Sequence, residues 1–433
     1  MAPPFLRSPF AVTILAVVAS VSVAALIATP QVVAGERSQG IKTEVVSFSR
    51  TCGTQCMDDV AAGARSRGCT NVRVFATLRM LAAACPNVVV ADPPAGDAAI
   101  KSAPAKPSGW ASVPGVEAVA PDVAVRLSSP VGTGLDGAAR QRIPTQRRRP
   151  WGLDRVNQAE LPLDGDSSTS DCYPKAGRGV HVFVVDSGCN ARHEQFAHLG
   201  DRLRVMQAPG ADISDGEDLN GHGTHVIGTI AGKDTGVAPG VRVTSVQVIG
   251  RSGRGLGSDI VAGIEVAAAW AAANPDTPTV LSASLGAPQE SRRPHIFTIA
   301  VERAAAESGL LVITAAGNDR TDACRSSPGN SRGAINVANG NANDRLAYDS
   351  NYGTCVDVIA PGTRIVSADA FDTSGLTTKS GTSMAAPHVT GLAALILAER
   401  GKMTWQELLA ALTPEPRVMV ARYPLAWVDP TQC

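Results

Sequence analysis

The chain has 433 residues, of which 44% are hydrophobic and 18% charged, and its 39 basic side chains balance 39 acidic ones. This hydrophobic content excludes a disordered chain, and the net charge of zero gives no indication of a nucleic-acid partner. The length exceeds one ordinary domain, so we expect a core of roughly 250 to 300 residues with an appended domain. Because aromatic residues are only 4%, small and β-branched side chains must build the core, as in closely packed parallel strands and helices.

The first 34 residues have the features of a secretory signal. Arg7 precedes an apolar run at 10–28, and small residues at 32–34 follow it as a cleavage site. The run is also near the shortest length that spans a membrane, so an uncleaved anchor is the competing interpretation. Nine cysteines suit an oxidising compartment. We therefore expect residues 1–34 to be the signal peptide of a secreted protein.

Residues 35–127 alternate between strand and helix patterns, which predicts a small α+β domain. The expected elements are a strand at 43–49, a helix at 57–67, and strands at 72–78 and 116–127. Two disulfide bridges would stabilise such a small core. The four cysteines available here allow three pairings, which the sequence leaves open: Cys52, Cys56, Cys69 and Cys85.

Between 128 and 150 the chain becomes rich in Gly, Pro, Ser and Gln and loses its apolar periodicity, which predicts a linker. It also contains five arginines: Arg140, Arg142, Arg147, Arg148 and Arg149. One interpretation is a solvated basic tether, and the other is a processing segment that holds a maturation site. We favour processing because of the segments that lie on either side.

From Trp151 onwards, strand and helix patterns alternate. Strands are expected at 180–185, 241–249, 279–285, 310–315 and 355–359, and helices at 258–273, 297–307 and 384–398. This alternation predicts an α/β fold whose mostly parallel sheet is covered by helices on both faces. In such sheets the ligand site lies at the carboxyl ends of the strands. One more helix and an extended end are expected at 404–433.

Three motifs in one chain order supply an acid, a base and a nucleophile. Asp186 ends a strand in V-V-D-S-G, His222 lies in N-G-H-G-T-H, and Ser383 opens an apolar helix in S-G-T-S-M-A-A-P. A carboxylate can orient an imidazole, which then removes the proton of a serine hydroxyl. A serine at a helix amino terminus also has free N–H groups near a developing oxyanion. These residues predict a charge-stabilised serine hydrolase.

Asn318, in A-A-G-N at the end of another strand, can supply a second oxyanion donor through its side-chain amide. Zinc binding by His222 and His225 is a rival hypothesis, but no third ligand cluster with metal spacing follows and H-E-x-x-H is absent. We expect His225 to be a structural residue of its helix. A lipase or esterase is disfavoured because G-T-S-M-A is not the G-x-S-x-G elbow and the residue order differs.

With these motifs the chain resembles the subtilisin-like serine endopeptidases, most closely their proteinase K branch. The order Asp, His, Ser is that of subtilisin, and the resemblance extends from about Trp151 to Gly401. It implies a subtilisin-like α/β catalytic domain at 151–433. The site residues that it implies are Asp186, His222 and Ser383 as the triad and Asn318 as the oxyanion donor.

The resemblance also implies that residues 35–127 are an inhibitory prodomain, which assists folding, blocks the cleft and is removed by the enzyme itself. Its partners would then be protein or peptide substrates and its own prodomain. We expect a monomer that requires no organic cofactor and binds no nucleic acid.

Substrate contacts follow from the same resemblance. Two short strands would pair with an extended substrate backbone, which gives affinity with little demand on sequence; they contain Gly253, Arg254, Gly255 and Ser284, Leu285, Gly286. The primary specificity pocket would be lined by Ala315, Ala316 and Gly317, small residues that leave room for large apolar side chains. Arg254 departs from the small polar residues often seen at this place, so we expect an outer-subsite preference for acidic residues.

The resemblance further implies a disulfide between Cys324 and Cys355. It implies a structural calcium site at Asp357, completed by the main-chain carbonyls of Arg332 and Ala334, because hard cations prefer oxygen ligands. Three cysteines have no counterpart in the family: Cys172, Cys189 and Cys433. Cys189 either pairs with Cys172 or is buried and inert.

Two functions of different classes follow from the sequence. The first is a secreted serine endopeptidase made as an autoprocessed zymogen. The alternative is a catalytically silent subtilase-fold protein with a binding or regulatory role. Silent members usually lack a triad or oxyanion residue, and none is missing here, so we favour the enzyme.

Overall fold

The computed structural model describes residues 42–85, 110, 113, 115–122, 124–127, 150–167, 173–289, 295–415 and 417–429. The expected signal peptide, nearly all of the expected linker, Cys172 and Cys433 lie outside these residues. Residues Gly40–Cys433 form one compact unit. Within the described ranges, no helix has the length and apolar character needed to cross a membrane. The domain boundaries expected from the sequence stay predictions.

The N-terminal part is a four-stranded antiparallel sheet with one helix, which confirms the small α+β arrangement. The strand order is β2-β3-β1-β4, and the helix α1 packs against β2 and β3. The bounds are β1 (Lys42–Phe48), α1 (Thr54–Ser66), β2 (Thr70–Phe75), β3 (Met80–Cys85) and β4 (Val116–Pro121). The all-apolar strand β3 was not expected, because its run carries no alternation and follows a turn at Arg79 with φ +48°.

The single strand expected at 116–127 is wrong. The chain leaves the N-terminal sheet at the end of β4, and β5 (Ala124–Leu127) joins a different sheet, between β9 (Arg254–Leu256) and β11 (Leu285–Pro288). Asp122, between the two strands, accepts hydrogen bonds from the N–H and the hydroxyl of Ser258 at 2.8 and 2.6 Å. Partners more than 120 residues away in the sequence therefore decide where the strand breaks.

The main sheet has seven parallel strands in the order β15-β14-β12-β10-β6-β8-β7. Five of them match the expected strands to within a few residues, whereas β7 and β14 were not expected. Their bounds are β6 (His181–Asp186), β7 (Leu203–Gln207), β8 (Arg242–Gln247), β10 (Thr279–Ala283), β12 (Leu311–Ala315), β14 (Ala334–Gly340) and β15 (Val358–Pro361).

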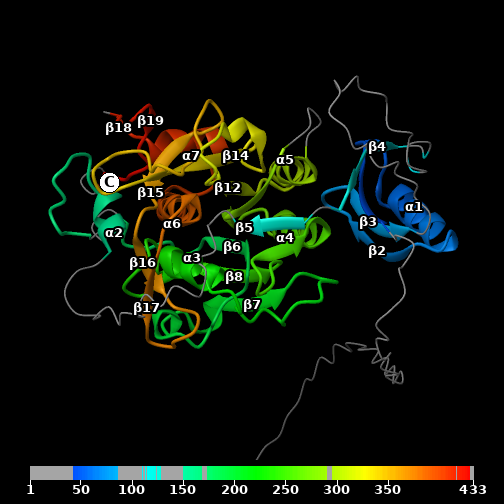
Figure 1. Ribbon diagram of the computed structural model, residues 1–433, viewed down its shortest axis with the longest axis horizontal. Coiled ribbons are helices and arrows are strands. Elements are labelled where there is room, and N and C mark those ends of the chain that lie inside the picture. Colours follow the sequence, from blue (N-terminus) through cyan, green and yellow to red (C-terminus); the bar gives the residue numbers. More distant parts are fainter. Residues whose placement is uncertain are drawn as a thin grey trace, which may run out of the picture. The chain divides into compact units, whose positions relative to one another are not determined.

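Helices cover both faces of this sheet, as expected (Figure 1). On β6, Val182 and Val184 pack in the cluster that contains α3 and α6, whereas Phe183 and Val185 pack in the cluster of α4 and α5. Both faces are therefore buried, which explains why the strands are apolar runs without alternation. The helix bounds are α3 (His222–Ala231), α4 (Gly257–Ala273), α5 (Ile296–Ser308) and α6 (Thr382–Arg400).

The remaining elements complete the C-terminal part. A hairpin of β16 (Ile365–Ala368) and β17 (Leu376–Lys379) precedes α6, and β13 (Ser326–Ser327) pairs with β11. The expected tail is α7 (Trp405–Leu412) followed by β18 (Met419–Val420) and β19 (Tyr423–Pro424). Thr404 caps α7 in a reciprocal arrangement with Glu407, the sequence signal of a helix start. The short helix α2 (Trp151–Arg155) precedes β6.

Three disulfides lie among the described residues. Cys52 bonds to Cys56 and Cys69 to Cys85, which selects one of the three pairings left open, and Cys324 bonds to Cys355. Cys189 is a free, buried thiol, so the pairing with Cys172 is wrong. Burial raises the pKa of the Cys189 thiol well above its usual value. A neutral buried thiol is unreactive, as the second interpretation required.

Candidate active site

Asp186 and His222 form a buried, directly hydrogen-bonded pair. Asp186 ends the central strand β6 and is fully buried, and His222 opens α3 with 2% of its surface exposed. The Nδ1 atom of His222 lies 2.8 and 2.9 Å from the two carboxylate oxygens of Asp186, and the Ser187 N–H donates to Oδ1 at 2.7 Å. An ionised carboxylate only accepts, so Nδ1 carries the proton and Nε2 is the basic nitrogen.

The position of His222 depends on Asp218, which sequence reasoning missed. This buried carboxylate accepts hydrogen bonds from the N–H groups of Gly221 and Thr224 at 2.7 and 2.8 Å and from the Thr224 hydroxyl at 2.7 Å. Burial raises the pKa of Asp218, and the hydrogen bonds from Thr224 oppose that rise. Asp218 therefore holds the first turn of α3. An acidic residue four positions before the histidine was the available signal.

Glycines make room for this helix start. Gly221 has φ +88°, a left-handed conformation that L side chains rarely adopt. A Cβ atom on Gly223 would collide with the backbone carbonyl of Gly188 and lie 3.3 Å from Oδ1 of Asp186. The two glycines next to His222 thus let α3 begin directly against the end of β6.

Ser383 is the second residue of α6 and is fully buried. Its hydroxyl donates to the carbonyl of Ser284 at 3.2 Å, at the end of β10, the strand next to β6 in the sheet. Because α6 begins at Thr382, the N–H groups of its first turn and the positive end of the helix dipole lie near this hydroxyl. The expected nucleophile therefore lies at the same edge of the sheet as Asp186.

The side chain of Asn318 is fixed at one end and unpaired at the other. Its Oδ1 accepts a hydrogen bond from the N–H of Thr382 at 2.9 Å, whereas its Nδ2 is buried and has no partner among the described residues. An unsatisfied buried donor costs about 1–3 kcal/mol, so such groups are rare without a function. The amide is tied to the residue before Ser383 and has an N–H available for an oxygen acceptor.

The two strands expected to bind substrate enclose an extended segment of the chain itself. In register, β5 pairs Arg126 with Gly286 and Leu127 with Leu285 on β11, and Arg126 with Arg254 on β9. The N–H of Leu127 also donates to the carbonyl of Gly253 at 3.2 Å. Along β5 the side chains of Val125 and Leu127 are buried, and those of Ala124 and Arg126 are exposed.

The residues expected to line the specificity pocket end β12 and lead into Asn318. Ala315 and Ala316 are buried, and Gly317 has φ +99°. The N–H of Gly317 donates to the hydroxyl of Thr382 at 3.1 Å, which ties this segment to the start of α6. Gly317 and Asn318 are thus both joined to the start of α6 through Thr382.

The N-terminal sheet contacts helices α4 and α5 through buried charged groups. On α4, the Glu265 carboxylate accepts from the N–H groups of Thr77 and Leu78 at 2.8 and 2.9 Å. On α5, Arg303 donates to the carbonyls of Phe48, Leu78 and Arg79 at 2.7–2.9 Å and to Glu117 at 2.6 Å. Apolar side chains of both parts also share one core cluster, among them Phe75 and Met80.

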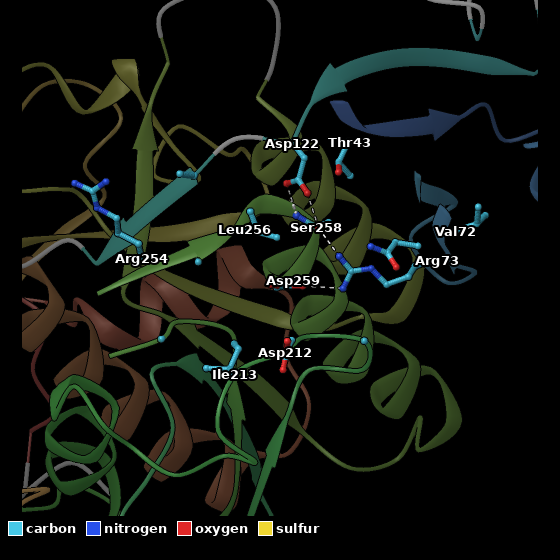
Figure 2. Close-up of a pocket in the computed structure, with 15 residues that line it drawn as sticks. Thr43, Val72, Arg73, Asp122, Asp212, Ile213, Arg254, Leu256, Ser258 and Asp259 are labelled. Carbon is cyan, nitrogen blue, oxygen red and sulfur yellow. Dashed lines mark hydrogen bonds and ion pairs between the residues drawn. The ribbon is translucent and has the colours of Figure 1, made fainter. Parts of the chain in front are cut away.

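A second group of contacts lies at the start of α4 (Figure 2). Arg73 of β2 forms an ion pair with Asp259 at 2.8 Å and a hydrogen bond with Ser258, which also binds Asp122. These residues border a cavity of about 570 Å³ that is lined from the N-terminal sheet and from the segments at 210–213 and 250–259. No sequence pattern indicated this interface, because each partner alone is an ordinary surface charge.

The expected calcium ligands lie close together around the start of β14. The Oδ2 atom of Asp357 accepts from the N–H of Asn336 at 2.8 Å, and Ala334 begins the same strand two residues earlier. The N–H of Arg332 donates to Glu302 at 3.1 Å, which orients this part of the backbone. Burial raises the pKa of Asp357. A carboxylate completed by main-chain carbonyls is the kind of oxygen donor set that suits a hard cation.

The histidines proposed for the rival zinc site have other partners. His222 donates to Asp186, and the Nε2 atom of the fully buried His225 lies 3.0 Å from the carbonyl oxygen of Ile365. Burial holds the pKa of His225 well below its usual value, so the ring is neutral. Among the described residues, no group of three His, Cys, Asp or Glu side chains is arranged to hold a metal ion.

Comparison with known proteins assigns this fold to a family. Residues 177–415, more than half of the chain, match the family described as Subtilase family. A crystal structure of a cold adapted subtilisin-like serine proteinase is 35% identical with a TM-score of 0.56, and the match covers 65% of this chain and 98% of that one. The chain therefore belongs to the subtilase family, which confirms the resemblance and the fold class expected from the sequence.

Two curated relatives are bacterial proteins. An extracellular serine proteinase of Thermus sp. (strain Rt41A) is 40% identical over 262 residues, and alkaline serine exoprotease A of Vibrio alginolyticus is 39% identical over 262 residues. Each match covers 60% of this chain, but 60% and 46% of the relatives' own lengths. The chain thus spans about half the length of the curated relatives it matches.

Proposed function

We propose that this protein is a secreted serine endopeptidase that is made as a zymogen and processes itself. One observation carries the proposal: a buried Asp186–His222 pair and an unpaired Asn318 amide lie at the sheet edge where Ser383 opens a helix. Membership of the subtilase family and the names of its extracellular relatives support secretion and peptide-bond hydrolysis.

In the proposed mechanism, His222 removes the proton of the Ser383 hydroxyl as Oγ attacks the carbonyl carbon of the scissile bond. Asp186 keeps the tautomer in which Nε2 is the base and stabilises the imidazolium that forms. The oxyanion accepts hydrogen bonds from Nδ2 of Asn318 and from N–H groups at the start of α6. His222 then protonates the leaving amine, which leaves an acyl group on Ser383, and water attacks this ester in the same way.

The substrate backbone would take the place of β5. Because antiparallel main-chain pairing with β9 and β11 places few demands on side chains, we propose broad sequence specificity. The short side chains at Ala315, Ala316 and Gly317 favour large apolar residues immediately before the scissile bond.

The register of β5 predicts the site of self-cleavage. Leu127 pairs with Leu285, so a chain that continued by one residue in this register would oppose Ser284, whose carbonyl accepts from the Ser383 hydroxyl. Ser128 itself lies outside the described residues. We propose that the first cut follows Ser128, because an intramolecular cut is favoured by proximity and does not require the large apolar residue preferred in separate substrates. The arginine-rich segment up to Arg149 is then removed later or kept.

Residues 35–127 would then act as the enzyme's own inhibitor. After the cut, β5 would remain in the cleft as a product. Its pairing with β9 and β11 would hold it there, together with the hydrogen bonds that Glu265 of α4 and Arg303 of α5 form with the N-terminal part. A monomer whose inhibitor is cut from its own chain requires no separately made regulator.

We also propose a structural calcium at Asp357, with the carbonyls of Arg332 and Ala334 as further ligands. The ion would neutralise a buried carboxylate. Removal of calcium with EDTA should lower the Tm of the Ser383→Ala protein by several degrees, and Asp357→Asn should show the lower Tm without EDTA. A Tm that EDTA does not change would refute the calcium proposal and leave the protease proposal intact.

The experiment that tests the function is intact-mass analysis of the protein and its Ser383→Ala variant, each treated with a fluorophosphonate. The wild type should become shorter, with a new N-terminus at Ser129, and gain one phosphonyl group. Ser383→Ala should stay full-length and unlabelled, whereas the exposed-serine control Ser374→Ala should behave like the wild type. A wild type that is neither shortened nor labelled would instead support the silent binding or regulatory protein.

A further inference from the structure

Two arginines lie directly opposite each other in the four-stranded sheet β13-β11-β5-β9. The register pairs Arg126 of β5 with Arg254 of β9, and both side chains are exposed. Residues directly opposite in an antiparallel pair have Cβ atoms roughly 5 Å apart and share one face of the sheet. Since like charges in this position repel, β5 is a poor electrostatic match for the strand that binds it.

Neither arginine is paired with an acidic side chain in the part of the chain that the structure describes. No ion pair of Arg126 or Arg254 occurs among the described residues. Of the carboxylates that line the same cavity as Arg254, Asp122 is held by Ser258 and Asp259 by Arg73 (Figure 2). Asp212, which also lines the cavity, forms no ion pair with Arg254 in the described structure.

The alternation along β5 determines which substrate side chain meets Arg254. Val125 and Leu127 point into the core, so the side chains between and outside them point to solvent. If the scissile bond follows residue 128, Arg126 is the third residue before it. A substrate bound in the same register would place its third residue before the scissile bond opposite Arg254.

We infer that Arg254 is a specificity-determining residue, which favours an acidic side chain at the third position before the scissile bond. The inference rests on the proposed protease function and on β5 as a substrate-like segment. Arg126 at this position weakens product binding after self-cleavage, so the inhibitory segment leaves more readily than an acidic one would. Arg254 thus selects substrates and, by repelling Arg126, also promotes activation.

The first test compares three peptides on enzyme activated from the full chain. Their sequences are Val-X-Leu-Ser followed by a common leaving segment, with X as Glu, Gln or Arg. At low ionic strength kcat/KM should follow the order Glu, Gln, Arg, with about a fivefold difference between the ends. At high salt the difference should shrink, because exposed charges are screened.

Charge variants of Arg254 provide the control. Arg254→Gln should remove the preference, and Arg254→Glu should reverse it, each measured as the ratio of kcat/KM between the Glu and Arg peptides on the same variant. Equal rates for the three peptides on wild type, or an unchanged order in Arg254→Glu, would overturn the inference. Hydrolysis of none of the peptides by wild type would overturn the proposed function and the inference with it.

The second test concerns activation. In the full chain, Arg126→Glu should prolong the lag before activity appears, because the product then binds Arg254 by opposite charge. Adding Arg254→Glu should restore the lag toward that of the wild type only if the two side chains oppose each other, since the two introduced carboxylates then repel. An unchanged lag in Arg126→Glu would contradict the role of Arg126 in release.

Discussion

At the scale of single residues, the candidate site contains a buried hydrogen-bond donor that has no acceptor among the described residues, the side-chain amide of Asn318. The Asn318 oxygen is occupied by Thr382, and its buried nitrogen has no acceptor in the described structure. Folding leaves this cost in place, and formation of the oxyanion would recover it. A donor that gains its partner only as the oxyanion forms stabilises the transition state more than the ground state.

Replacement of Asn318 should therefore lower turnover rather than substrate binding. We expect Asn318→Leu, which has a similar shape, to reduce kcat by about a hundred- to a thousandfold with KM nearly unchanged. Asn318→Asp keeps the oxygen that binds Thr382 but should be equally impaired, because it lacks the donor. Steady-state kinetics on a peptide substrate measure both, with the exposed Asn343→Leu as control. A rise in KM at constant kcat would assign Asn318 to substrate binding instead.

His388 is a buried histidine that the proposed chemistry does not use. It lies in α6, its Nδ1 donates to the carbonyl of Met384 at 2.8 Å, and burial lowers its pKa to about 4. In the unfolded chain a histidine titrates near 6.5, so between about pH 6.5 and 4 the unfolded state binds the extra proton. Stability is then lost as the pH falls through this window, by about 3 kcal/mol for this group.

We expect His388→Asn to have a shallower loss of Tm between pH 7 and 4.5 than the parent Ser383→Ala protein, which cannot digest itself. Asparagine keeps a donor for Met384 and has no charge to gain. His181 and His295, whose pKa values burial also lowers to about 4, should retain part of the slope. An identical pH dependence in the two proteins would exclude His388 as a source of acid instability.

At the scale of elements, the start of α3 is the critical junction. The helix begins against the end of β6, with Asp218 holding its first turn and Gly223 in contact with the backbone of Gly188. A Cβ atom on Gly223 would push α3 away from β6, and His222 would then move away from Asp186. Small residues around the histidine are therefore a packing requirement of the Asp186–His222 pair.

Gly223→Ala should test this requirement. Its new Cβ would meet the Gly188 carbonyl, so α3 must move, and a misplacement of about 1 Å costs on the order of a hundredfold in kcat/KM. The matched control is Gly63→Ala in α1, where no atom lies within 4 Å of the new Cβ. That change should preserve activity and stabilise α1 by about 0.5–1 kcal/mol. Wild-type activity in Gly223→Ala would show that the junction tolerates the shift.

At the scale of the whole molecule, the proposed inhibition would depend on contacts that lie away from the proposed catalytic residues. Arg303 is mostly buried and donates to three carbonyls and one carboxylate of the N-terminal sheet. Loss of this side chain leaves buried acceptors unpaired in the complex but leaves the active site untouched. Release of the N-terminal segment and turnover should therefore be separable.

We expect Arg303→Gln to shorten the lag before activity appears by roughly tenfold or more, with the final kcat/KM unchanged. The control is Arg417→Gln, because Arg417 is largely exposed and pairs only with the nearby Glu415. Progress curves of peptide hydrolysis after dilution of the zymogen measure the lag. If Arg303→Gln and Arg417→Gln had equal lags, the α5 contacts would contribute nothing to inhibition.

Local patterns were sufficient for the regular elements of the core and failed where distant partners decide. The central strands and α4, α5 and α6 were predictable, because a strand buried on both faces and a long apolar helix each have a local signature. The break between β4 and β5 has no such signature. It is caused by the hydrogen bond that Asp122 accepts from the Ser258 N–H and by the pairing of β5 with β9 and β11. The apolar run of β3 was equally ambiguous without its neighbours.

The sequence by itself determined the family and indicated the proposed chemistry, since serine hydrolysis requires an acid, a base and a nucleophile, and Asp186, His222 and Ser383 stand in one recognisable order. Only the tertiary structure decided what these groups meet. It capped α3 with Asp218, left one end of Asn318 unpaired and set Arg126 against Arg254. The physical reason is that the type of a residue determines the chemical properties of its side chain. Contacts between segments far apart in the sequence determine which other groups that side chain meets.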